Sequence, residues 1–191
     1  TLKRINWKLS ARTKQLYSRQ YERLQNPNIV VALDTALLEE GKGDIIDIST
    51  EAAISLAQHF VNKKHTVDIV FLRDQEGFDN RVIQLSNKND ISKMQFNLAN
   101  TPFYASEEQF DLTPNDNKYI VGADKIFLIS SNPSPATISD FTDYCNNGKL
   151  ARCIIPSPVL PEEQIEGDYN QGVAIKITDA DQIREKVGDV L

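Results

Sequence analysis

N-I-V-V-A-L-D-T, residues 28 to 35, is the segment around which the remaining strands and helices are predicted to assemble. Five apolar residues run without interruption from Ile29 to Leu33, and the acid Asp34 follows them. An unbroken apolar run of this length is typical of a strand buried on both faces, as in a parallel sheet. Open α/β sheets bind ligands at the carboxyl ends of their strands. We therefore expect Asp34 to lie at the functional edge of a central sheet.

Strands and helices alternate through the rest of the chain. The predicted strands cover residues 67–72, 81–85, 125–130, 151–155 and 172–177, and the predicted helices cover 48–61, 90–98, 136–146 and the residues after Thr178. This alternation implies right-handed crossovers and a parallel sheet with a shorter strand at its edge. Asp47 or Ser49 is expected to cap the first helix. Between residues 100 and 123 the pattern is weak, and only an edge strand around 103–104 is predicted.

Length and composition predict one folded domain with an N-terminal arm. A chain of 191 residues, 40% of them apolar, is long enough to form one sizeable core, and size scaling gives roughly 70% burial of its unfolded surface. We assign residues 1–27 to the arm and residues 28–191 to the domain. The two cysteines, Cys145 and Cys153, match no zinc spacing and are expected to be buried, reduced thiols. Because the chain begins abruptly within a charged segment, we expect it to be part of a longer protein.

The net charge of −6 is unevenly distributed. The first 23 residues hold seven basic residues and one acid, so they carry +6 while the remainder carries −12. Such an arm can contact nucleic acid or an anionic lipid surface, or it can fold onto the acidic body, which we favour. An edge strand is predicted within it, from Gln15 to Tyr21. The sequence contains no signal peptide and no apolar run near the ~20 residues that a membrane span needs.

Sequence motifs that would indicate catalysis are missing. G-K-G-D-I-I, after the first strand, lacks the third glycine of a dinucleotide fingerprint. The chain contains no G-x-x-x-x-G-K-[ST] phosphate loop and no G-x-S-x-G nucleophile elbow. Cysteine and histidine are too few and too scattered for a metal cluster, and D-T-A at residues 34–36 lacks the second aspartate of a phosphoaspartyl hydrolase. We therefore expect a protein that is not an enzyme and that uses no cofactor.

Two pieces of sequence carry a resemblance to a known family. R-I-N-W-K-L-S-A-R-T-K-Q-L-Y-S-R-Q-Y-E, from Arg4 to Glu22, stands shortly before the apolar strand that ends in Asp34. Together they closely resemble the family called domain of unknown function 58. The residues that carry its signature are Arg4, Trp7, Ser10, Ala11 and Arg12. The resemblance implies a von Willebrand factor A-type domain: an α/β, Rossmann-like, three-layer sandwich with a mostly parallel central sheet and one antiparallel edge strand.

The resemblance also implies a metal-ion-dependent adhesion site, from which this sequence departs. In the A-type pattern the first strand ends in Asp-x-Ser-x-Ser, and the corresponding residues here are Asp34, Ala36 and Leu38. The second aspartate of the pattern, at the end of the fourth core strand, is missing from the turn Ser130-Ser131-Asn132. Magnesium and manganese require oxygen ligands. We therefore predict a degenerate site that holds no tight metal ion.

The function that the resemblance implies is protein–protein interaction without catalysis. Similar proteins are accessory partners of MoxR-type AAA+ ATPases and are usually tethered by N-terminal transmembrane helices. We therefore expect a cytoplasmic domain at the inner face of the cell membrane, anchored only through a region outside this chain. The residues expected to bind the partner at the strand ends are Asp34, Thr35, Glu39, Glu40, Ser131 and Asn132.

Two alternative functions stay open at this point. A metal-dependent adhesion-type binder with an unusual Mg²⁺ or Mn²⁺ site would gain affinity with Mg²⁺ and lose it in EDTA. A nucleic-acid or anionic-lipid binder would use the basic arm, and its affinity would fall steeply as the salt concentration rises. In the interpretation that we favour, the partner is a protein and no nucleic acid is bound.

Overall fold

A computed structural model of the chain describes residues 27–39, 42–73, 82–157, 173–179 and 181–183. The basic arm with its predicted strand at 15–21 lies outside these residues, as do Glu40 and most of the helix predicted after Thr178. The described part contains a strand at every place where the sequence predicts one beyond the arm.

Six strands form one central sheet in the order β4-β3-β1-β6-β7-β8. Neighbouring strands are parallel except for β3 and β4, which are antiparallel and place β4 at the edge. This confirms a mixed α/β architecture with a mostly parallel sheet and one antiparallel edge strand, and the arrangement is compatible with a Rossmann-like fold. The six strands are β1 (Ile29–Asp34), β3 (Val67–Leu72), β4 (Val82–Leu85), β6 (Lys125–Ile129), β7 (Leu150–Pro156) and β8 (Ala174–Ile177).

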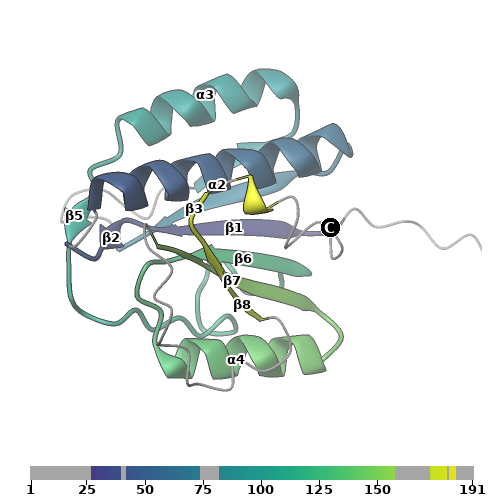
Figure 1. Ribbon diagram of the computed structural model, residues 1–191. Coiled ribbons are helices and arrows are strands. Elements are labelled where there is room, and N and C mark those ends of the chain that lie inside the picture. Colours follow the sequence, from purple (N-terminus) through teal and green to yellow (C-terminus); the bar gives the residue numbers. More distant parts are fainter. Residues whose placement is uncertain (1–26, 40–41, 74–81, 158–172, 180, 184–191) are drawn as a thin grey trace, which may run out of the picture.

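Helices cover both faces of this sheet and give the described part three layers (Figure 1). α2 (Lys42–Asn62) and α3 (Lys88–Ala99) lie on one face, and α4 (Pro135–Asn146) lies on the other. Among the helices in the part of the chain described by the structure, none is long and apolar enough to cross a membrane.

β1 is central because both of its faces are apolar. Successive side chains of a strand point to opposite faces. Ile29, Val31 and Leu33 pack in the core beneath α2 and α3, whereas Val30 and Ala32 pack in the core on the side of α4. All six residues of β1 are buried, as its unbroken apolar run predicts.

The first helix begins earlier than the sequence indicates. α2 starts at Lys42, so Asp47 and Ser49 lie inside the helix and the prediction that one of them caps it is wrong. Gly43 made this start hard to predict, because glycine costs about 1 kcal/mol relative to alanine within a helix. Burial of Ile45, which is 2% exposed, favours the extra turn. Asp44 lies in that turn, where a negative charge complements the helix dipole.

The other two helices begin and end within two residues of the predicted positions, because their caps are local in sequence. Asn87 accepts from the backbone N–H groups of Asn89 and Asp90, and the Asp90 side chain accepts from the Asn87 backbone, which forms a capping box. Ser134 caps α4 just before a proline. Gly148, with φ of 78°, follows the end of α4, as expected for a glycine just beyond a helix.

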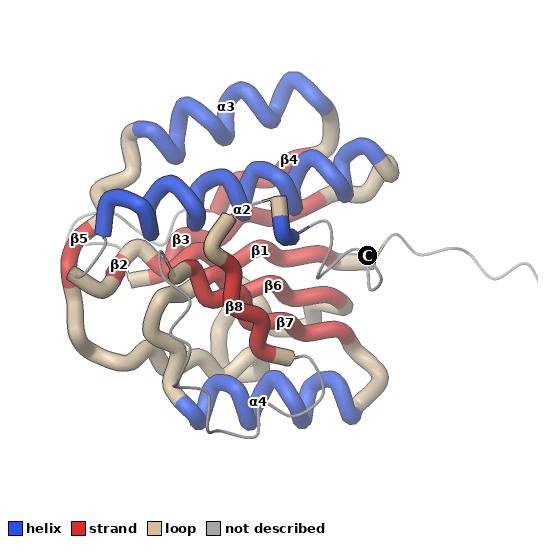
Figure 2. The backbone as a smooth tube through the Cα atoms, viewed as in Figure 1, coloured by secondary structure: helices blue, strands red, loops and turns tan. Residues whose placement is uncertain are grey.

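A second, smaller sheet lies at the carboxyl edge of the first. β2 (Ala36–Leu37) directly follows β1 and pairs in parallel with β5 (Tyr104–Ala105). After β5 the chain runs irregularly to β6, and it forms an isolated bridge between Phe110 and Pro133 on the way (Figure 2). The first part of this segment, residues 106–110, therefore lies next to the carboxyl ends of β1 and β6.

Candidate functional site

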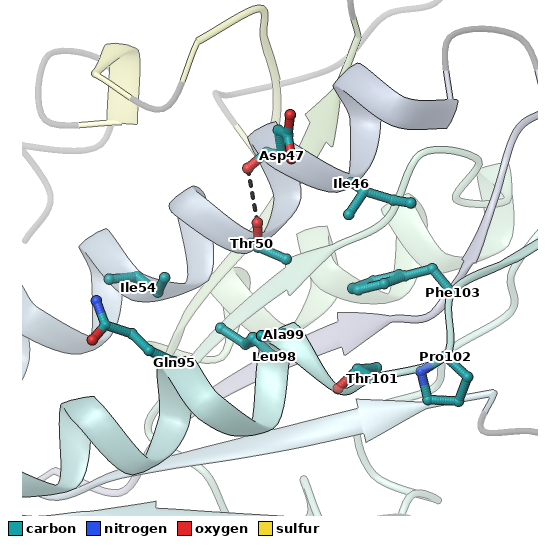
Figure 3. A pocket seen from close by; sticks show the side chains of 10 residues that line it. All are labelled: Ile46, Asp47, Thr50, Ile54, Gln95, Leu98, Ala99, Thr101, Pro102 and Phe103. Carbon is teal, nitrogen blue, oxygen red and sulfur yellow. Dashed lines mark hydrogen bonds between the residues drawn. The ribbon is translucent and has the colours of Figure 1, made fainter.

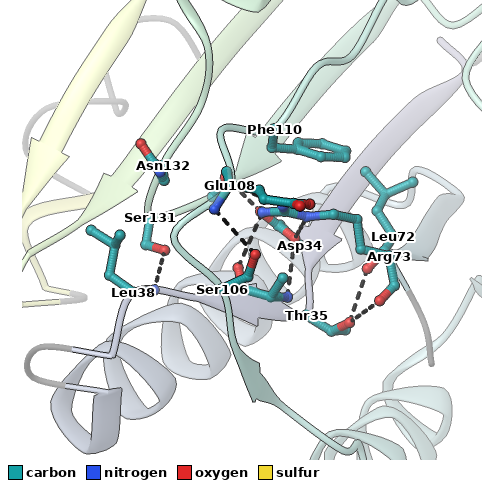
Figure 4. Close-up of polar contacts among 12 residues, drawn as sticks. Asp34, Thr35, Leu38, Leu72, Arg73, Ser106, Glu108, Phe110, Ser131 and Asn132 are labelled. Atoms are coloured by element: carbon teal, nitrogen blue, oxygen red, sulfur yellow. Dashed lines mark hydrogen bonds and ion pairs between the residues drawn. The ribbon is translucent and has the colours of Figure 1, made fainter.

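The carboxyl ends of three neighbouring strands bring the site residues together. β1 lies between β3 and β6, and the register pairs Asp34 with Leu72 and Leu33 with Ile129. Arg73, which follows β3, and Ser130, which follows β6, both hydrogen-bond to Asp34. Figure 4 shows the guanidinium of Arg73 against the Asp34 carboxylate. The prediction that Asp34 lies at the carboxyl edge of the central sheet is confirmed.

Asp34 and Arg73 form a two-point ion pair at this edge. Arg73 Nε donates to Asp34 Oδ1 at 2.8 Å, and Arg73 Nη2 donates to Asp34 Oδ2 at 2.6 Å. The Asp34 side chain is fully buried, and the Arg73 side chain is 17% exposed. A planar guanidinium matches both oxygens of a carboxylate, so the pair is stronger and more directional than a lysine contact would be.

Two further donors complete the surroundings of the carboxylate. Ser130 Oγ donates to Asp34 Oδ2 at 2.7 Å, and the backbone N–H of Ala36 donates to Asp34 Oδ1 at 3.1 Å. An ionised carboxylate offers about four acceptor positions, and four donors are present. Asp34 therefore has no acceptor position left for a ligand or a metal ion.

Arg73 is held in place by its backbone and by Thr35. The φ of Arg73 is 54°, in the left-handed region that residues with side chains seldom adopt. Thr35 Oγ1 lies 3.0 Å from Leu72 O and 3.1 Å from Arg73 O, so its hydroxyl can donate to the carbonyl groups at this bend. Burial alone lowers the pKa of Arg73, but the hydrogen bond and charge of Asp34 raise this pKa above its ordinary value. The guanidinium therefore stays cationic.

The guanidinium also contacts neighbouring loops. Its Nη1 donates to Glu108 O at 3.1 Å, and its Nη2 lies 3.4 Å from Ala36 O. Arg73 Cζ lies 4.8 Å from the centroid of the Phe110 ring, within the range of a cation–π contact. One side chain thus links β1, β2 and the segment that follows β5.

These residues do not fit a divalent cation. Both Asp34 oxygens accept from Arg73, and Ala36 and Leu38 offer no side-chain oxygen. Ser131 Oγ is within hydrogen-bond distance of the Leu38 backbone N–H, at 3.1 Å. Magnesium requires a near-octahedral set of oxygens, which these side chains do not supply. Within the described ranges, no three His, Cys, Asp or Glu side chains gather closely enough to hold a metal ion.

The buried thiol on β7 is not poised for nucleophilic chemistry. Both cysteines are free thiols; Cys153 is fully buried as predicted, whereas Cys145 is only half-buried. Burial, followed by the charge of Asp34, raises the pKa of the Cys153 thiol to about 12. Because the thiolate is the reactive form of cysteine, the neutral thiol at Cys153 is unreactive near neutral pH.

The structure separates the predicted partner-binding residues into buried and accessible ones. Asp34 and Thr35 are fully buried, so their predicted place on the contact surface is corrected to an internal one. Ser131 is buried as well, at 7% exposure. Glu39 is exposed and Asn132 is half-buried. Glu40 lies outside the described residues.

Four site residues were not predicted from the sequence: Arg73, Ser130, Glu108 and Phe110. Arg73 and Ser130 each directly follow a strand that neighbours β1. Since parallel strands end at the same edge, polar residues at or just after the ends of predicted strands are a signal that could have placed both at this edge, although not their contacts with Asp34. Glu108 and Phe110 lie where the pattern is weak, and no sequence signal pointed to them.

A separate hollow of about 570 Å³ lies between α2 and α3 (Figure 3). Its walls include the apolar side chains of Ile46, Ile54, Leu98 and Phe103. Thr50, which also lines it, donates its hydroxyl to Asp47 O at 3.0 Å within α2. The hollow lacks a cluster of charged groups like the one at Asp34, so the strand ends are the stronger candidate site.

No family model matches the chain, and no curated protein sequence matches it. The class that the structure defines is a mixed α/β protein with a mostly parallel, Rossmann-compatible central sheet.

Proposed function

We propose that the chain is a non-catalytic protein–protein interaction domain of the von Willebrand factor A type. It binds its partner through what we call the strand-end surface. The accessible residues of this surface are Leu38, Glu39, Glu107, Glu108, Gln109 and Asn132. The observation that carries the proposal is that four internal donors occupy the carboxylate of Asp34. Because this carboxylate is closed to substrate and metal, Asp34 shapes the surface above it and takes no part in chemistry.

Two features support the A type. The sheet has one antiparallel edge strand, and β1, whose end carries Asp34, lies in its interior. Both agree with what the resemblance of residues 4–22 and 28–35 implies. The degenerate adhesion-site positions, Ala36 and Leu38, follow Asp34 directly at the same edge.

The charges of the strand-end surface favour a partner with basic side chains. Glu39, Glu107 and Glu108 are exposed, while the nearby positive charge of Arg73 is neutralised by Asp34. Complementary potentials speed association and exclude like-charged partners. In the A-type pattern a metal ion would supply positive charge at this place; here the accessible charge is negative.

The partner that we propose is a MoxR-type AAA+ ATPase. This part of the proposal rests on the sequence resemblance alone, which also suggests a location at the inner face of the cell membrane. Any tether would lie outside this chain.

The direct test is binding to the purified MoxR-type ATPase encoded in the same genome. Nucleotide-free ATPase is passed over the immobilised chain in EDTA, then with Mg²⁺, then with ATP or ADP. We expect retention in EDTA. Glu107→Lys with Glu108→Lys should weaken binding by about tenfold or more, because the surface charge reverses. The matched control, Glu51→Lys with Asp143→Lys, makes the same charge change on exposed positions of α2 and α4.

Three outcomes contradict parts of this proposal. Failure to retain the ATPase in every nucleotide state removes the proposed partner. Retention that is lost in EDTA and restored by Mg²⁺ without nucleotide selects the metal-dependent alternative. Equal losses in the double variant and its control place the contact elsewhere on the protein.

A further inference from the structure

The segment of residues 106–110 lies across the strand ends and carries much of the strand-end surface. Both of its ends are fixed by backbone hydrogen bonds. Ser106 N donates to Leu37 O at 2.8 Å, and Phe110 N donates to Asn132 O at 2.8 Å. Between these points the chain is irregular, so its shape depends on side-chain contacts.

Arg73 provides such a contact from beneath. Its Nη1 donates to Glu108 O, and its guanidinium lies over the Phe110 ring. The same guanidinium is locked to Asp34 by two hydrogen bonds. Asn132 Nδ2 adds a contact from the end of β6, donating to Glu107 O at 3.1 Å. Arg73, which belongs neither to this segment nor to β1, therefore connects the segment to the end of β1.

A guanidinium in this position holds neighbouring loops together as a bound cation would. A cation at a carboxylate draws several loops into one geometry, but it leaves when its free concentration falls. Arg73 is attached to the chain, and the left-handed backbone at Arg73 and the Thr35 hydroxyl hold it at the carboxylate. Its charge is permanent at any pH that the protein tolerates.

We propose that Arg73 is a built-in cation that latches residues 106–110 onto the strand ends. It thereby positions Glu107 and Glu108 for the partner. The latch extends the proposed function by naming the residue that sets the shape of the strand-end surface. Arg73 is a positioning residue in this scheme, because the partner touches the segment above it.

A latch and a purely structural ion pair predict different results in hydrogen exchange. Breaking a pair that only stabilises the fold accelerates exchange in proportion to global unfolding. Breaking the latch releases the segment while the sheet stays closed. Because loss of the Arg73 charge also leaves Asp34 buried without its partner, amides of β1 and β6 should accelerate with global unfolding, and the amide of Phe110 should accelerate by a larger factor.

The experiment uses the full chain with Arg73→Met, which keeps the length of the side chain and removes its charge. Because the segment loses a hydrogen bond to a charged group, exchange of the Phe110 amide should accelerate by about tenfold or more. Arg152→Met is the matched control. Arg152 is a half-buried arginine on β7 that donates to Ala151 O at 2.8 Å.

Rescue experiments keep the test decisive if Arg73→Met folds poorly. In Arg73→Ala, sub-denaturing guanidinium ion should restore the protection of Phe110, because the free ion can enter the space beside Asp34. Millimolar Mg²⁺ should not restore it, since Ala36 and Leu38 supply no oxygen. Arg73→Lys should restore protection only in part, because an ammonium group cannot hold both Asp34 oxygens and Glu108 O.

The latch is overturned if exchange at residues 106–110 changes no more than in the Arg152→Met control. It is also overturned if every amide accelerates by the same factor, or if Mg²⁺ rescues Arg73→Ala as well as guanidinium does. Binding of the ATPase separates the two proposals. Local release with unchanged affinity shows that the latch exists and contradicts docking on this surface. If residues 106–110 stay protected in Arg73→Met and affinity is lost only in Glu107→Lys with Glu108→Lys, the result supports docking and overturns the latch.

Discussion

At the residue scale, folding removes the charges of Asp34 and Arg73 from water. This costs several kcal/mol per ion unless partners replace the lost hydration. Ser130 and the backbone N–H of Ala36 supply that replacement for the carboxylate. Removing one partner of such a pair leaves an uncompensated buried charge and costs about 3 to 5 kcal/mol. The ion pair therefore holds the ends of β1 and β3 together as well as neutralising both charges.

The same pair shows what the sequence could reveal about the site. Asp34 was predictable, because an acid directly follows an unbroken apolar run. The role of Arg73 was not, because nothing in the sequence states that the strand before it lies beside β1. The burial of Thr35 was not predictable either, since a threonine after a strand end usually faces solvent.

Cys153 gives a prediction that depends on pH. Its pKa is raised to about 12 in the folded protein, whereas an unfolded thiol titrates near 8.5. Between these values the unfolded chain loses its proton first, so the native state is the one that binds more protons. The free energy of unfolding should therefore fall with rising pH by about 1.4 kcal/mol per pH unit from this group alone.

The measurement is urea unfolding of the parent and of Cys153→Ala at pH 8 and pH 10. Cys153→Ala should lose less stability over this interval than the parent does. Cys145→Ala, at the half-buried second cysteine, is the control and should follow the parent. Parallel losses in the parent and Cys153→Ala would show that the thiol does not titrate in this way.

At the element scale, the three described helices differ in how well their ends could be predicted from the sequence. The starts of α3 and α4 were predictable to within two residues, because Asn87 and Ser134 cap them through neighbours in sequence. The start of α2 was not, because it depends on burying Ile45 against the rest of the molecule. Ser49 illustrates the result: it was a candidate cap and is instead a fully buried residue within the helix.

Ser49 therefore gives a prediction about helix stability. Its Oγ is buried without a hydrogen-bond partner in the described structure, and an unsatisfied buried polar group costs about 1 to 3 kcal/mol. Ser49→Ala removes this group and should raise the free energy of unfolding by about 1 kcal/mol or more. Ser92→Ala, on the exposed side of α3, is the control and should gain only the difference in helix propensity. A loss of stability in Ser49→Ala would mean that the hydroxyl has a partner.

At the scale of the whole molecule, one sheet separates two apolar cores. Phe127 lies in the core beneath α2 and α3, and Phe141 lies in the core beneath α4. Since β1 contributes side chains to both cores, neither can open without disturbing the other. The described part should therefore unfold as a single unit.

Truncation of each core tests this cooperativity. Phe127→Ala and Phe141→Ala should each lower the free energy of unfolding by about 3 to 5 kcal/mol. Each should retain one transition that is the same by circular dichroism and by hydrogen exchange. Phe96→Ala is the control, because Phe96 is 72% exposed and its loss should change stability by less than about 0.5 kcal/mol. A second transition in either core variant would contradict a single unit.

The sequence alone determined the alternation of strands and helices, the burial of β1 on both faces and the position of Asp34 at a strand end. These features follow from apolar runs and local caps, which act between neighbouring residues. Only the tertiary structure decided that Arg73 neutralises Asp34, that Thr35 is internal and that residues 106–110 lie across the strand ends. The reason is physical: strand order and register bring together residues as far apart as Asp34 and Ser130, and contacts at that separation leave no periodic trace in a sequence.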